Sequence, residues 1–348
     1  MAATSQPPTQ SRWKTALNTF LNEPLPRGVG WFHSLGSILL FLAILQAFTG
    51  LLLALYYSPG AEVAYESIQY IETQVISGKF IRGLHHWTAS AFVVILALHI
   101  LRTFLYAAYK KPRQFTWVLG VLLFLTILGF AFTGYLLPWD MKAYFATRVG
   151  IQVAASAPMV GKAMARLLQG GAELSALTLT RFYALHVIVL PLTLLLLIAL
   201  HVVAVRYFHI TPPWKRNDEP VEMTGRFYPD QLARDVVAIV AVFAVIAVLA
   251  QSRGAPLEAR ADPANTSYIP RPDWYFYGLF QLMRLFQGKY EILGTLILPG
   301  LFIAILLLIP FIDKNPERAW RKRPLALLAG VFTFLIILGF TFWGGLEG

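Results

Sequence analysis

The chain has 348 residues, of which 57% are hydrophobic and 14% are charged, and its mean hydropathy is +0.59. This balance is far from that of an average soluble domain and predicts a protein that lies mostly in lipid. The net charge of +11 has no nucleic-acid signature, because no basic stripe is interleaved with aromatic residues on a soluble element. Cysteine is absent, which excludes disulfides, thiolate-bound iron–sulfur clusters and thioether-linked haem within the chain.

Seven apolar stretches are long enough to cross about 30 Å of hydrocarbon as helices. We therefore predict an all-α membrane protein. The spans are expected at residues 33–57, 84–108, 115–137, 182–208, 233–251, 290–312 and 324–343.

The spans form two groups, separated by a polar segment that contains the adjacent Pro212 and Pro213 and charges of both signs. We predict an N-terminal four-helix transmembrane bundle over residues 1–210, a linker over 211–225, and a C-terminal domain with three transmembrane helices over 226–348. The first thirty residues lack the charged stub, apolar core and cleavage site of a secretory signal. The first helix is therefore expected to direct membrane insertion.

Lys and Arg are unevenly divided between the two sides of the expected bundle. The side with the N-terminus and the second, fourth and sixth connections carries the excess, including the basic runs 110–113 and 321–323. Because cytoplasmic connections are rich in Lys and Arg, the N-terminus and the linker are expected to be cytoplasmic and the C-terminus outside. We expect a multi-pass protein of a bacterial inner membrane, in contact with lipid.

Two pairs of histidines lie inside apolar helical stretches, His85 with His99 and His186 with His201. Their steps of 14 and 15 residues correspond to roughly 21 and 22 Å along a helix, with partners within about 60° of one face. Each helix therefore offers one imidazole near each side of a membrane. Neutral imidazole is a ligand of haem iron, so two such helices could hold two haems stacked across the bilayer.

An intramembrane histidine can also form hydrogen bonds between helices or belong to a proton path. Four histidines in two matched pairs favour the haem interpretation, and four glycines strengthen it. The first and third expected helices each carry two glycines 14 residues apart, at the depths of the histidines, where a missing side chain leaves space for a macrocycle edge. These glycines are Gly36 with Gly50, and Gly120 with Gly134.

Other residues near the pairs have more than one interpretation. His86 lies about 140° from the face of the first pair, so it is not expected to be a ligand. Pro191, within the second pair, is expected to bend its helix. Arg82, Arg102 and Arg206 lie three to five residues from the expected ligands, and could pair with haem propionates or extend to the membrane surface as interfacial arginines do.

Several motifs, spread over most of the chain, recur together in one protein family. They are His85–Ser90 with His99, Lys110–Arg113, Gly134–Asp140, Arg181–His186 with His201, and Pro272–Tyr275. With these motifs the chain resembles cytochrome b of the cytochrome bc complexes, most closely the b6 type, because fourteen residues separate the histidines of the fourth helix. The resemblance implies two b-type haems, an outer low-potential haem held by His85 and His186 and an inner high-potential haem held by His99 and His201.

The PDWY segment, residues 272–275, lies in the expected outer connection between the fifth and sixth helices. Its aromatic side chains could form a belt at the membrane interface, but a belt leaves the acidic residue unexplained. The resemblance implies a quinol-oxidation loop in which Asp273 replaces the usual glutamate as proton acceptor, with Tyr275 as a catalytic neighbour. The quinone-binding residues implied for this pocket are Tyr135, Trp139, Asp140, Pro272, Asp273, Trp274 and Tyr275.

On the cytoplasmic side, residues 227–235 lead into the fifth helix and resemble the segment that lines the quinone-reduction site of the family. Arg234 and Asp235 match its basic and acidic positions, with Arg206 and His209 as candidate neighbours. A carboxylate at a helix start and an interfacial arginine are an equally good interpretation.

The chain departs from the b6 type at two points. That type carries a cysteine early in the first helix that fixes an additional haem, and the matching residue here is Ser34, so no covalent haem is expected in this chain. The b6 type also divides its four-helix and three-helix parts between two chains, whereas here the linker fuses them.

The resemblance implies the dihaem cytochrome b subunit of a quinol:cytochrome c oxidoreductase, or of a complex with a similar acceptor. Quinol oxidised outside would give one electron to a Rieske iron–sulfur protein and one to the outer haem, and the inner haem would reduce quinone, in a proton-translocating Q-cycle. The implied partners are the Rieske protein, a c-type cytochrome subunit, a second copy of the chain, lipid and quinone. Two other classes stay open, namely a dihaem membrane anchor that needs no outer acidic loop, and a transporter that binds no haem.

Overall fold

A computed structural model describes residues 12–216, 219–265 and 267–347. Residues 1–11 of the expected N-terminal segment and residues 217–218 of the expected linker lie outside this part. Seven helical segments within it are long and apolar enough to cross a membrane, which confirms the expected all-α architecture. They comprise α2 (Leu35–Ala54), α4 (Gly78–Leu105), α5 (Gln114–Tyr135), α8 (Ala176–Ala184) continued by α9 (Leu190–Phe208), α10 (Leu232–Arg253), α12 (Leu298–Ile312) and α13 (Pro324–Leu346).

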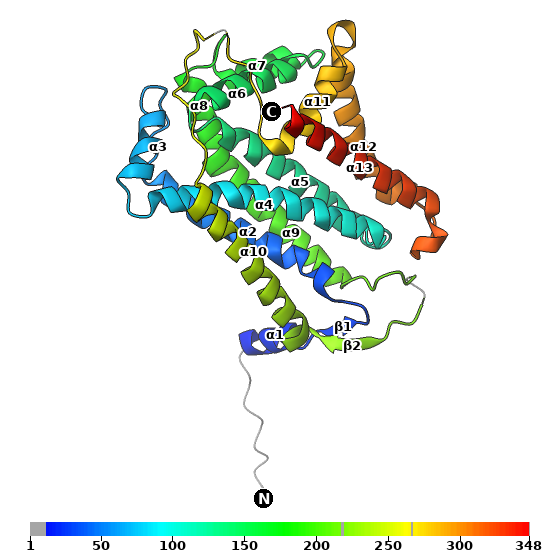
Figure 1. The fold of residues 1–348 in the computed structure, drawn as a ribbon. Helices are drawn as coiled ribbons and strands as arrows, with labels where there is room; N and C mark the ends of the chain where they lie inside the picture. The colour runs from blue at the N-terminus through cyan, green and yellow to red at the C-terminus, as the bar shows by residue number, and fades with distance from the viewer. Residues whose placement is uncertain (1–11, 217–218, 266, 348) are drawn as a thin grey trace, which may run out of the picture.

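The long helices pack in pairs along their lengths (Figure 1). α4 packs against α2 and α10, α5 packs against α9, and α12 contacts α5. A buried apolar cluster between α2, α4 and α10 includes Leu42, Phe92 and Ile246. This packing places α4, which contains His85 and His99, and α9, which contains His201, in one bundle, with α2 packed on α4 and α5 packed on α9.

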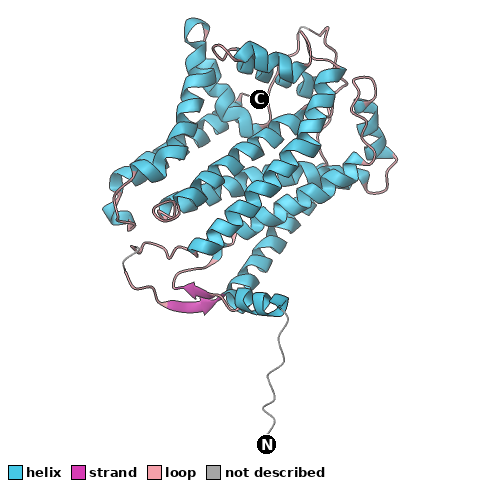
Figure 2. Ribbon diagram, turned by 180° about the vertical axis from the view of Figure 1, so that it is seen from behind, coloured by secondary structure: helices cyan, strands magenta, loops and turns pink. Residues whose placement is uncertain are grey.

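Short helices and one small sheet lie at the two ends of the bundle (Figure 2). They lie outside the long apolar stretches and were not predicted from the sequence. At one end, which we call the α6 end, lie α3, α6, α7 and α11. At the other, which we call the ribbon end, lie α1 and the antiparallel pair β1–β2. Their bounds are α1 Arg12–Leu21, α3 Ala64–Thr73, α6 Met141–Ala155, α7 Gly161–Gln169, α11 Tyr277–Leu285, β1 Pro24–Pro26 and β2 Met223–Arg226.

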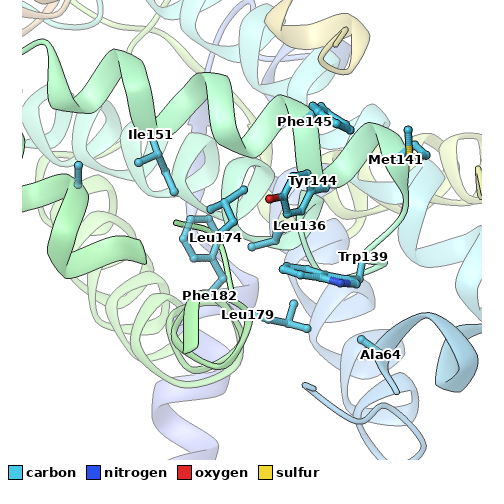
Figure 3. Packing of buried hydrophobic residues seen from close by; sticks show 11 residues of the cluster. Ala64, Leu136, Trp139, Met141, Tyr144, Phe145, Ile151, Leu174, Leu179 and Phe182 are labelled. Carbon is cyan, nitrogen blue, oxygen red and sulfur yellow. The ribbon is translucent and has the colours of Figure 1, made fainter. Parts of the chain in front are cut away.

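A second buried cluster fastens α6 over the ends of α5 and α8 (Figure 3). Leu136 and Trp139, in the connection between α5 and α6, belong to it together with Tyr144 of α6 and Leu179 and Phe182 of α8. Each such buried side chain contributes roughly 1.5–3 kcal/mol of transfer free energy. The start of α6 is therefore held firmly at the mouth of the bundle.

The helix with the second histidine pair is not a regular α-helix. A π-helical turn over Leu185–Val189 contains His186, and Pro191 follows in the first turn of α9. Proline has no N–H to donate, so the α-helical pattern is interrupted just before it. Because a π-turn adds one residue to a helix, the 15-residue step from His186 to His201 covers about the same rotation as a 14-residue step in a regular helix. The structure thus has a π-turn directly before Pro191, the residue at which we expected a bend.

Candidate redox and quinone sites

The four expected ligand histidines each face one of the four expected glycines. A Cβ atom placed on any of these glycines would lie 2.5 to 3.7 Å from an imidazole Cε1. The packing of α2 on α4 and of α5 on α9 thus brings each ring over backbone that has no side chain. The pairs are Gly36 with His99 (3.7 Å), Gly50 with His85 (3.2 Å), Gly120 with His201 (3.5 Å) and Gly134 with His186 (2.5 Å).

At the α6 end, the rings of His85 and His186 lie opposite each other. Their centroids are 6.4 Å apart and their planes make an angle of 68°. An imidazole nitrogen binds a metal ion such as zinc at about 2.0–2.1 Å. A spacing of this order therefore leaves room for one metal ion between the rings, with one nitrogen ligand from each. His99 and His201 lie farther along the same two helices, toward the ribbon end.

Two threonines orient the rings at the α6 end. Thr49 Oγ1 lies 2.9 Å from Nδ1 of His85, and Thr133 Oγ1 lies 3.1 Å from Nδ1 of His186. Each hydroxyl donates its own hydrogen to a carbonyl four residues earlier in its helix, so its oxygen accepts from Nδ1–H. Nε2 of each ring is then unprotonated and can bind a metal.

These threonines were not expected from the sequence, although a repeated tetrapeptide contains them. The tetrapeptide Ala-Phe-Thr-Gly occurs at residues 47–50 and again at 131–134. The repeat places a hydroxyl one residue before a glycine on each of the two supporting helices. A partner on the second ring nitrogen is a regular feature of histidines that bind metals.

The three arginines expected near the ligands have different partners. Arg82 forms an ion pair with Glu72 and donates to two backbone carbonyls. Arg206 forms an ion pair with Glu23. Arg102 is different, because its buried Nε has no hydrogen-bond partner among residues 12–216, 219–265 and 267–347. Arg102 is therefore the arginine best suited to an anionic group beside the histidines of the ribbon end.

These features fit one haem at the depth of His85 and His186 and a second haem at the depth of His99 and His201. The four glycines leave a cradle that a Cβ would fill, which suits the edge of a flat macrocycle. Imidazole nitrogens are common axial ligands of haem iron, and a buried guanidinium suits a propionate.

At the α6 end, both carboxylate oxygens of Asp273 are engaged. Oδ1 lies 2.6 Å from Nζ of Lys142, and Oδ2 accepts a hydrogen bond of 3.0 Å from the hydroxyl of Tyr275. Burial and the charge of Asp273 raise the pKa of Tyr275 well above its usual value, so the phenol stays protonated and donates. Trp274 Nε1 donates to Ser90 Oγ at 3.2 Å, which ties the PDWY segment to α4.

Other residues expected to bind quinone lie beside the PDWY segment. Tyr135 donates a 3.1 Å hydrogen bond to the carbonyl of Arg271, directly before the segment. Asp140 caps α6, with Oδ1 accepting from the backbone N–H of Ala143 (2.8 Å) and Oδ2 from that of Glu258 (3.1 Å). Burial raises the pKa of Asp140 against the opposing effect of these hydrogen bonds.

At the ribbon end, Asp235 is buried in a small polar cluster. Its Oδ1 accepts from Gln231 Nε2 at 2.7 Å, and its Oδ2 accepts from Ser37 Oγ at 2.7 Å. Gln231 also donates to Ser34 Oγ at 3.1 Å. The neighbouring Arg234 is directed to a backbone carbonyl 3.5 Å away. The structure therefore joins α10 to the start of α2 through the carboxylate of Asp235.

The residues expected beside Asp235 have another partner. His209 lies 3.4 Å from Glu23, the residue that also pairs with Arg206. A role for Gln231 was not expected from the sequence. It lies four residues before Asp235 and so on the same helical face.

Comparisons with known proteins agree with this arrangement. A family model described as cytochrome b/b6/petB matches residues 20–209, and one described as cytochrome b(C-terminal)/b6/petD matches residues 260–347. A solved structure described as a hyperthermophilic respiratory Complex III has a TM-score of 0.85 and 26% sequence identity, and the match covers 96% of this chain and 89% of that one.

Two relatives span different shares of the chain. A cytochrome bc complex cytochrome b subunit from Chlorobaculum thiosulfatiphilum is 34% identical over 310 residues, which are 88% of this chain and 72% of that protein. A menaquinol:cytochrome c reductase cytochrome b subunit from Bacillus subtilis is 45% identical over 182 residues, which are 52% of this chain and 81% of that protein. The chain therefore belongs to the cytochrome b/b6 family, as a b-type haem-binding membrane oxidoreductase subunit that contains both the N-terminal and the C-terminal domain of the family.

Proposed function

We propose that the chain is the dihaem cytochrome b subunit of a quinol:cytochrome c oxidoreductase, or of a complex with a similar acceptor. The observation that carries the proposal is the match of four glycines to four histidines at two levels of one bundle. The bacterial relatives named as menaquinol:cytochrome c reductase subunits favour menaquinol as the substrate.

Each haem would be held by one histidine from α4 and one from the helix formed by the π-turn Leu185–Val189 and α9. His85 and His186 would hold the outer, low-potential haem, with Gly50 and Gly134 against its ligands. The inner, high-potential haem would lie between His99 and His201, against Gly36 and Gly120, with Arg102 as its propionate partner. Bound haem supplies one-electron transfer across the membrane, which would couple quinol oxidation at one side to quinone reduction at the other.

The α6 end is the proposed site of quinol oxidation and the outer side of the membrane. Asp273 would accept a proton from a quinol hydroxyl, because it is the carboxylate of the PDWY segment and it lies between α6 and α11. Tyr275 would donate to that carboxylate, and Tyr135 and the start of α6 would exclude water from the pocket. The outward path of the proton would begin at Asp273.

The ribbon end is the proposed cytoplasmic side, where quinone is reduced. Arg234 and Asp235 are the candidates for binding and proton delivery, although Asp235 must first exchange a hydrogen bond from Gln231 or Ser37 for one from its ligand. The N-terminus would be cytoplasmic and the C-terminus outside, in a bacterial inner membrane.

The complex would contain a Rieske iron–sulfur protein as acceptor of one electron from each quinol and a c-type cytochrome beyond it. A homodimer and bound lipid complete the proposed assembly. The relatives named as subunits of bc-type complexes support these partners.

Two measurements on the purified complex test this function. A reduced-minus-oxidised spectrum should show two b-type haems for each chain, and a transporter would show none. Blocking quinone reduction with an inhibitor should increase the reduction of haem b during quinol oxidation. A dihaem membrane anchor with one quinone site would show no such increase, and that result would exclude the proposed electron bifurcation.

A further inference from the structure

Each oxygen of the Asp273 carboxylate contacts one donor, and the two donors come from different elements. Lys142 of α6 lies 2.6 Å from Oδ1, and Tyr275 donates to Oδ2 at 3.0 Å. The side chains of Lys142 and Asp273 are only 25% and 16% exposed, so solvent screens this ion pair weakly. The resemblance to cytochrome b assigned no role to Lys142.

Lys142 is placed by backbone that is itself well fixed. It lies in the first turn of α6, directly after Met141, whose N–H donates to the carbonyl of Ala259 at 2.9 Å. Asp140 caps the same turn. In the same position, its Nζ also lies 5.7 Å from the ring centroid of Tyr135, within the range of a cation–π contact.

The groups that face Asp273 come from four elements. They are Lys142 of α6, Tyr275 of the PDWY segment, and Tyr135 of α5 and His86 of α4, both of which interact electrostatically with Asp273. The phenol of Tyr275 stays neutral, since burial and Asp273 raise its pKa. Among the lysines and arginines in the described part of the chain, Lys142 forms the ion pair with Asp273.

We propose that Lys142 is a positioning residue for quinol oxidation that acts through Asp273. Its ammonium group holds the carboxylate at the wall of the pocket through their ion pair until quinol binds. When a quinol hydroxyl transfers its proton to Asp273, the carboxyl group becomes neutral and the ion pair is lost. Lys142 then rests on Tyr135, and it draws the carboxylate back once the proton has left. This inference rests on the proposed quinol-oxidising function of Asp273.

The test compares pH profiles of quinol:cytochrome c activity in the purified complex. An opposite charge within about 4–6 Å commonly favours ionisation of a carboxyl by 1–3 pH units. The Lys142→Met variant should therefore move the acidic limb of the profile upward by about one pH unit, and its rate deficit should shrink as the pH rises. Lys142→Arg keeps the charge and should restore the limb. Lys162→Met, at an exposed lysine of α7, is the matched control and should leave the limb in place.

Haem spectra recorded on every variant establish that the complex has assembled, and Lys142→Gln replaces Lys142→Met if that variant does not assemble. An unshifted limb in the neutral variants, or a rate loss of equal size at every pH, would overturn the role of Lys142. An Asp273→Asn variant measured in parallel separates the two proposals. If Asp273→Asn is inactive and the limb of Lys142→Met is unshifted, only the role of the lysine fails. If Asp273→Asn has its normal rate, the proton-acceptor role of Asp273 fails, and the role of Lys142 fails with it.

Discussion

Gly134 of α5 faces the imidazole of His186 so closely that a Cβ at residue 134 would lie 2.5 Å from Cε1 of the ring. Real Cβ atoms essentially never approach so near, so any side chain at residue 134 must move the ring. At the other end of the bundle, Gly36 leaves more space, with a corresponding distance of 3.7 Å to His99. Both glycines leave space for the edge of a haem beside a proposed ligand ring.

The first prediction uses this close approach. Gly134→Ala should displace His186 and remove the outer haem, which would halve the haem content of the purified chain. Gly339→Ala, in α13, is the control and should keep both haems, because a Cβ there would have no heavy atom of another element within 4 Å. Haem quantification against protein concentration measures both variants. Equal haem contents would contradict the proposed cradle.

The second prediction concerns the ligands themselves. His99→Leu should remove the inner haem and keep the outer one, because the two levels use separate pairs of rings. A reduced-minus-oxidised spectrum, resolved by redox titration, should then contain only the low-potential component. If both components persist, His99 is not a ligand.

The third prediction concerns the threonines at the α6 end. Thr49→Val or Thr133→Val removes the oxygen that accepts from Nδ1–H and makes the ring a weaker electron donor. The midpoint potential of the outer haem should therefore rise, and losing such a partner typically weakens metal binding by about 10–100-fold. Thr126→Val is the control, because within the described residues the hydroxyl of Thr126 bonds only to a carbonyl of its own helix. A potential unchanged in both test variants would show that the hydroxyls do not tune the site.

The fourth prediction concerns the cap of α6. Asp140→Ala should destabilise the protein by about 1 kcal/mol for the lost cap, and by more for the second donor that it leaves unpaired. Asp140→Asn keeps one acceptor oxygen and should lose less. Thermal unfolding of the purified protein, followed by helical circular dichroism, ranks the variants. The reverse order would mean that capping does not control the stability of α6.

The fifth prediction concerns pH. Burial opposes ionisation of Asp313, but hydrogen bonds from Tyr109 and Lys110 and the charge of Arg323 outweigh it and lower the pKa of Asp313. An acid with a lowered pKa in the fold stabilises the protein above its unfolded value of about 4, and this stability is lost as the pH falls through the folded pKa. Asp313→Asn should therefore be less stable than the parent at pH 7. The difference between the two melting temperatures should shrink in acid, and a constant difference would contradict the assignment.

The sequence by itself determined the features that repeat along a helix. Apolar length predicted seven spans, and the steps between His85 and His99 and between the glycines placed them on matching faces, because helical periodicity is local. Helical periodicity predicted neither the short helices outside the apolar stretches, such as α6, nor the β1–β2 pair.

The tertiary structure decided which side chains meet across long separations. Asp273 and Lys142 are 131 residues apart, and Asp235 and Ser37 are 198 apart, so no periodicity relates them. The same holds for Arg82, whose position near a ligand suggested a propionate but whose guanidinium pairs with Glu72. A polar side chain forms its hydrogen bond or ion pair with the partner that helix packing brings within reach. That packing depends on the whole chain.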